Sequence, residues 1–78
     1  MSENYIPKII QAIKISLPGT ANADLDASTH FHDIPGMDSM SVVSFQMELT
    51  SIIGPKAEQA TPIMDMTLAE FAEVLASL

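Results

Sequence analysis

The run Gly36-Met37-Asp38-Ser39-Met40, near the midpoint of the chain, places a serine hydroxyl at the start of a long amphipathic segment. A serine at the first turn of a helix, with an aspartate just before it, is a suitable point for attaching a chemical group. Histidines lie nearby, but the pattern predicts neither an oriented acid–base pair nor a cavity for hydrolysis in so small a chain. We therefore expect a carrier of an attached group rather than an enzyme.

The charge of the chain is strongly negative. Ten acidic residues stand against three lysines and no arginine, which gives a net charge of −7 over 78 residues. Such a surface repels the phosphates of nucleic acids and the anionic headgroups of lipids, so neither is an expected partner. Proteins that carry basic surface patches are the expected partners instead.

Length and composition predict one domain, residues 1–78, with a small core. The chain has no cysteine, which excludes disulfides, thiolate metal sites and a thiol nucleophile supplied by the protein itself. The start of the chain has no basic and apolar pattern of a secretory signal, and no apolar stretch approaches the ~18–20 residues that span a bilayer. We expect a cytoplasmic protein that does not insert into membranes.

Helical spacing of apolar residues defines three main segments. The first is marked by Ile6, Ile9, Ile10, Ile13 and Leu17 and ends at Leu17-Pro18-Gly19. The second runs from Asp38 or Ser39 to Ile53 and is stopped by Gly54-Pro55. The third opens with Thr67-Leu68-Ala69-Glu70, which has the pattern of a capping box.

The connections complete the predicted architecture. A long loop from Thr20 to about Met37 is expected to be anchored on the core by Leu25, Phe31 and Ile34. Pro62–Met66 is expected to form at most a short helical turn. The fold class is predicted to be all-α: a small four-helix bundle of three main helices and one short one, with the long loop between the first two.

The second helix carries two apolar stripes. One is expected to face the core and consists of Val42, Phe45, Leu49, Ile52 and Ile53. The other consists of Met40, Val43 and Met47, about a third of a turn away. This second stripe has two interpretations: extra core beneath the long loop, or an exposed surface on which partner proteins dock beside Ser39.

The chain resembles the acyl carrier protein family over nearly its whole length. The family signature, Gly-x-Asp-Ser-Leu/Met at the start of the second helix, is matched by Gly36, Asp38, Ser39 and Met40. Phe31 matches the aromatic residue usual eight positions before the serine. Gly54 and Thr67-Leu68 fall where the family's second helix ends and its last helix begins.

The resemblance implies that Ser39 carries 4′-phosphopantetheine, transferred from coenzyme A by a phosphopantetheinyl transferase, with Asp38 assisting the loading. The arm would hold acyl groups as thioesters for acyl-loading and acyl-transfer enzymes. Met40, Val43, Met47 and Glu48 are the expected docking residues on a protein expected to be a monomer. The protein itself would catalyse no reaction.

The chain departs from housekeeping members of the family because its second helix is poor in acids, with Ser41, Ser44, Thr50 and Ser51 where those members carry several. We therefore expect a specialised carrier with dedicated partners, in fatty acid, polyketide or related lipid biosynthesis. Two alternatives stay open. One is a carrier of aminoacyl or aryl groups, and the other is a small acidic helical adaptor without any prosthetic group.

Two further patterns suggest metal ions. His30-Phe31-His32-Asp33 contains three ligand types, but its alternate histidines are expected to face solvent and no fourth ligand is in view, so no metal site is predicted. The segment from Asp24 imitates the opening of a calcium loop. It fails at its sixth and twelfth positions, where Thr29 and Pro35 replace glycine and glutamate.

Overall fold

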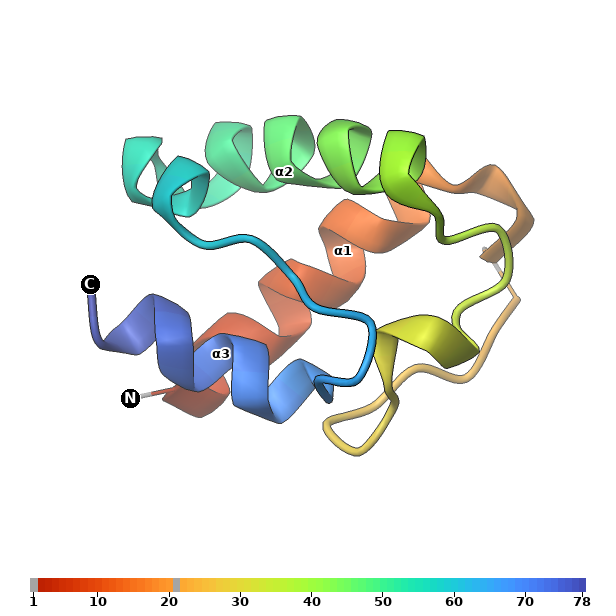
Figure 1. Ribbon diagram of the computed structural model, residues 1–78, viewed down its shortest axis with the longest axis horizontal. Helices are drawn as coiled ribbons and strands as arrows, with labels where there is room; N and C mark the ends of the chain where they lie inside the picture. The colour runs from red at the N-terminus through yellow and green to blue at the C-terminus, as the bar shows by residue number, and fades with distance from the viewer. Residues whose placement is uncertain (1, 21) are drawn as a thin grey trace.

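The computed structural model describes residues 2–20 and 22–78 and contains three α-helices within them: α1 (Ile6–Ser16), α2 (Ser39–Ile53) and α3 (Leu68–Ala76) (Figure 1). Short 3-10 helices punctuate the chain at η1 (Ser2–Tyr5), η2 (Pro18–Thr20), η3 (Phe31–Asp33) and η4 (Pro55–Gln59). The described residues form no strand, although an isolated bridge pairs His30 with Thr67. The prediction of an all-α fold is confirmed.

The three helices pack around a small core in a molecule that measures 29 × 22 × 19 Å. In Figure 1, α2 runs across the top of the molecule and α1 passes diagonally beneath it, in close contact. The third helix, α3, packs against η1 and α1. Of the helices in the described part of the chain, none is long and apolar enough to cross a membrane.

Three phenylalanine rings form the centre of the core. Phe31 comes from the long connection, Phe45 from α2 and Phe71 from α3, and all three are completely buried. Their ring centroids lie 5.4–5.8 Å apart, and both contacts of Phe31 are edge-to-face, an arrangement that aromatic rings favour. The long connection is therefore held by the same cluster that joins two of the helices.

Local sequence signals set the helix ends as predicted. Pro7 lies in the first turn of α1, where its missing amide hydrogen costs no helical bond. Gly54 ends α2 with φ at +104°, a conformation that side chains with a Cβ disfavour. Thr67 and Glu70 form the capping box of α3, with Glu70 N donating to Thr67 Oγ1 at 3.1 Å and Thr67 N donating to Glu70 Oε1 at 2.8 Å.

No helix forms at Pro62–Met66, in agreement with the expectation of at most a short helical turn there. One turn closes there, with Met66 N donating to Ile63 O at 2.9 Å. The carbonyls of Met64 and Met66 instead accept the amides of His32 and Phe31, each at 3.0 Å. Because these carbonyls pair with the long connection, the segment forms no helix, and the short helical element of this region lies earlier, in η4.

Candidate attachment site

Asp38 and Ser39 define the start of α2. Asp38 has an extended backbone, with φ −143° and ψ −174°, and its Oδ1 accepts a hydrogen bond from Ser41 N at 2.9 Å. This is the geometry of an N-cap, in which a side-chain oxygen satisfies an amide that the helix itself leaves without a partner. Ser39 is consequently the first residue of the helix, and both residues are exposed.

A tight turn leads into this cap. Gly36 has φ at +80°, which favours glycine, and its carbonyl accepts the hydroxyl of Ser41 at 2.8 Å. Ser41 thus uses its amide to bind Asp38 and its hydroxyl to bind the preceding turn. The backbone on both sides of Ser39 is fixed by local hydrogen bonds, while the Ser39 side chain stands at an exposed position.

The cap also determines the charge beside Ser39. The hydrogen bond donated by the Ser41 amide lowers the pKa of the Asp38 carboxyl below its usual value. Asp38 is therefore ionised at neutral pH. A carboxylate at this position interacts favourably with the positive end of the helix dipole.

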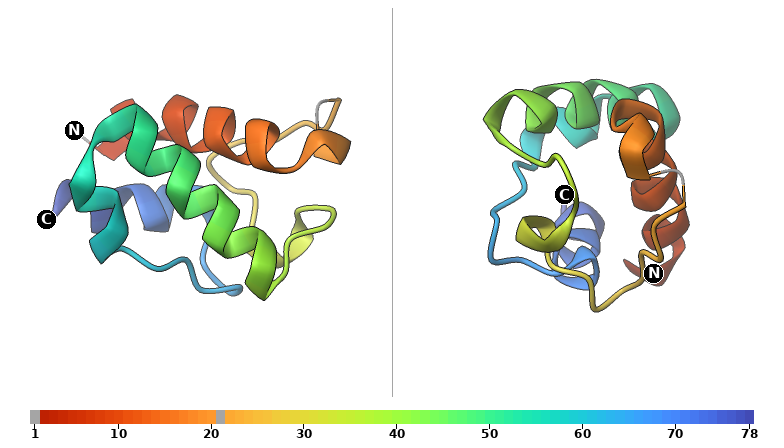
Figure 2. Two further views of the ribbon diagram at one scale, coloured as in Figure 1. Left: turned by 90° about the horizontal axis from the view of Figure 1, so that it is seen from above. Right: turned by 90° about the vertical axis from the view of Figure 1, so that its right-hand side faces the viewer.

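A shallow hollow of about 520 Å³ opens beside the serine. Its lining comes from the turn before α2, from the first turns of α2 and from the segment after η4: Met37, Asp38, Ser39, Val42, Pro62 and Met64. Figure 2 (left) shows the segment after η4 passing the start of α2. The pairing of His32 N with Met64 O fixes the far wall of the hollow.

The second apolar stripe of α2 is exposed. Met40 is 83% exposed, Val43 57% and Met47 68%, and we call these three residues the α2 strip. The interpretation of this stripe as extra core beneath the long loop is therefore wrong. Glu48, expected to accompany the strip, is half-buried in the same helix.

The segment after η4 also contributes to this region, beyond what the sequence predicts. Pro62 and Met64 line the hollow, and Ile63 between them is 60% exposed. The signal was the apolar character of Pro62-Ile63-Met64 in a stretch without helical periodicity. Apolar side chains that are exposed on so small a domain mark a candidate contact surface for a ligand or a partner.

Comparison of the chain with protein-family models, with curated proteins and with solved structures finds no match.

Proposed function

We propose that the protein is an acyl carrier protein that holds acyl groups on a 4′-phosphopantetheine arm attached to Ser39. The observation that carries the proposal is the exposed serine at the first position of α2, between an ionised capping aspartate and an apolar hollow. In this proposal the fold is the four-helix bundle of a carrier protein, with three main helices and one short helical turn before the last helix.

The position of Ser39 suits the loading reaction. The Ser39 hydroxyl attacks the phosphorus of coenzyme A that bears the pantetheine arm, and the bond from Oγ to phosphorus forms. The adenosine 3′,5′-bisphosphate part of coenzyme A leaves, and the serine proton passes to a base of the transferase. The phosphodiester then stands at a helix N-terminus, where amide hydrogens and the helix dipole favour negative charge.

Asp38 has two compatible roles in this proposal. It holds the first turn of α2 through Ser41, which keeps the Ser39 hydroxyl at a fixed place. Its exposed carboxylate also offers an oxygen ligand to the Mg²⁺ ion that a transferase uses with coenzyme A. Both roles use groups that lie exposed at the start of α2.

The arm supplies the thiol that this cysteine-free chain lacks, and acyl groups bind to it as thioesters. The hollow beside Ser39 offers apolar side chains, from Met37, Val42 and Met64, against which an arm or a short acyl chain can lie. The α2 strip provides the surface for partner enzymes. Methionines adapt to several partners because their side chains are flexible and polarisable.

Intact-mass measurement after loading tests the proposal. Purified protein is incubated with coenzyme A, Mg²⁺ and a broad-specificity phosphopantetheinyl transferase, beside the variants Ser39→Ala and Ser44→Ala. Ser44 is a matched control because it is an exposed serine in the same helix. We expect one phosphopantetheine on the wild type and on Ser44→Ala, and none on Ser39→Ala.

The rival function is an acidic helical adaptor that binds partners through the α2 strip alone, and the exposure of that strip is the observation that favours it. An adaptor would stay unmodified while the transferase loads a control carrier, and Ser39→Ala would leave partner binding unchanged. A mass gain that persists in Ser39→Ala would contradict the proposed site.

A further inference from the structure

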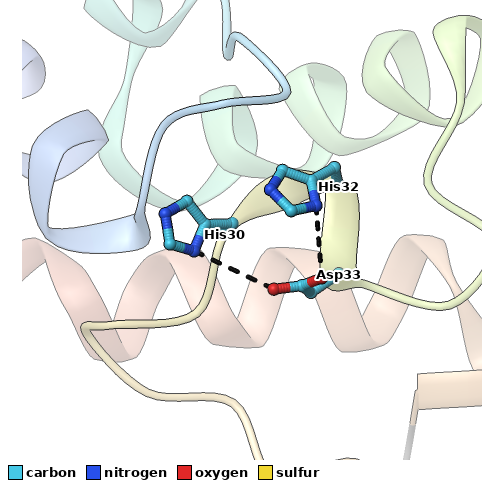
Figure 3. Close-up of side chains that lie close together, drawn as sticks. All are labelled: His30, His32 and Asp33. Carbon is cyan, nitrogen blue, oxygen red and sulfur yellow. Dashed lines mark ion pairs between the residues drawn. The ribbon is translucent and has the colours of Figure 1, made fainter.

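His30, His32 and Asp33 converge at η3, on the surface of the long connection (Figure 3). One ligand atom from each residue lies within 4.8 Å of the others. His32 Nδ1 is 3.2 Å from Asp33 Oδ1, and His30 Nδ1 is 3.9 Å from Asp33 Oδ2. The two imidazoles therefore turn the same nitrogen toward one carboxylate.

The backbone explains why alternate histidines meet. His30 is extended, with φ −84° and ψ 148°, and the tight turn of η3 begins immediately after it. Phe31 points into the core and is completely buried, while the residues on either side of it stay at the surface. The two imidazole rings consequently lie side by side, with centroids 5.1 Å apart and a tilt of 30°.

We propose that His30, His32 and Asp33 bind one Zn²⁺ ion, with water completing the coordination. Imidazole nitrogen and carboxylate oxygen are both zinc ligands, at about 2.0–2.2 Å, and three protein ligands plus water form a known tetrahedral set. Bonds of that length separate neighbouring ligand atoms by about 3.3–3.6 Å in a tetrahedron. The observed separations to Asp33 therefore need only small side-chain movements.

Contacts of the neighbouring backbone and of Phe31 fix the positions of the three proposed ligands. Phe31 is locked in the aromatic core, and the amides of Phe31 and His32 bind the carbonyls of Met66 and Met64. Three ligands within four consecutive residues leave almost no loop to order when the ion binds.

Charge favours a cation as well. The chain carries a net charge of −7, so its surface attracts cations in general. The half-exposed imidazoles and the exposed carboxylate leave open access for the ion and its water.

The ordinary alternative is that the two imidazoles contact Asp33 without any metal. Isothermal titration of tag-free, chelator-treated protein with Zn²⁺ separates the two, with Mg²⁺ and Ca²⁺ at the same concentrations as a test for general attraction to the negative surface. We expect one Zn²⁺ per chain and no comparable binding of the two oxygen-preferring ions. The ring protons of His30 and His32 should shift together in NMR spectra as the ion binds.

The variants His30→Gln, His32→Gln and Asp33→Asn each remove one ligand. Each should weaken zinc binding by at least about tenfold, a loss that even outer partners of metal ligands cause. Asp24→Asn is the matched control because it removes the same charge from an exposed position of the same connection, and it should bind zinc as the wild type does. Circular dichroism without metal checks that every variant folds.

Equal zinc affinity in wild type and Asp33→Asn would overturn the site, as would one ion shared by two chains. Absence of binding at millimolar Zn²⁺ would overturn it as well. The test is separate from the carrier function, because Ser39→Ala should bind zinc normally and Asp33→Asn should accept phosphopantetheine normally.

Discussion

One side of α2 faces the core through Phe45 and Leu49, which are completely buried, whereas the α2 strip on the same helix is mostly exposed. Both sides are apolar, so hydropathy alone does not separate them. The difference arises from the path of the rest of the chain: the rings of Phe31 and Phe71 pack on Phe45, and nothing comparable covers the strip in the part of the chain that the structure describes. Burial on one side stabilises the fold, and exposure on the other leaves a surface free for contacts.

The largest expected effect comes from Phe45→Ala on the buried side. It removes the ring that contacts Phe31 and Phe71, and it should lower the free energy of unfolding by about 3–5 kcal/mol. Urea denaturation followed by circular dichroism measures this loss. A loss below about 1 kcal/mol would show that the aromatic cluster does not hold the long connection to the helices.

A smaller effect on the free energy of unfolding is expected at the start of α2, where Asp38 caps the helix. Its pKa is lowered in the folded protein by the hydrogen bond from the Ser41 amide. An acid with a lowered pKa adds stability above its unfolded-state value of about 3.9, and this stability is lost as the pH falls through the folded-state pKa. Acid should therefore weaken the cap of α2.

The variant Asp38→Asn isolates this contribution, because its amide oxygen still accepts a hydrogen bond from Ser41 but cannot be protonated. Denaturation at pH 7, 4 and 3 should show that the stability advantage of the wild type over the variant shrinks on acidification. Asp26 and Glu70, whose pKa values are also lowered by local hydrogen bonds, affect both proteins alike. A difference that stays constant from pH 7 to pH 3 would contradict the charged cap.

The smallest expected effect on stability comes from Met47→Ala in the α2 strip. An exposed side chain away from any cap or core contact should change the free energy of unfolding by no more than about 0.5 kcal/mol. The same urea denaturation compares it directly with Phe45→Ala. Similar losses at the two positions would mean that the strip is covered in solution, for instance by a second molecule.

The helices could be predicted from the sequence because their signals are local. The spacing of apolar residues, the cap at Asp38 and the stop at Gly54-Pro55 all act within a few residues of the helix that they define. The bounds predicted for the second helix agree with α2 for the same reason. The core position of Phe31 was also predictable, since a large aromatic residue in a polar connection needs burial.

Contacts between distant segments could not be predicted in this way. The non-helical course of residues 62–66 depends on hydrogen bonds to Phe31 and His32, more than thirty positions earlier. The same pairing places Pro62 and Met64 beside Ser39. The exposure of the α2 strip likewise depends on the course of the long connection. The spacing of residues in the sequence does not predict that course.

The packing of η1 against α3 has a practical consequence. It places the first described residues close to the C-terminal end of the chain, on the side of the molecule away from the start of α2 (Figures 1 and 2). A fusion partner, a surface tether or a fluorescent label joined at either end would therefore project away from Ser39. The chain could be immobilised or built into a longer polypeptide while the serine, the hollow and the α2 strip stay open to approaching enzymes.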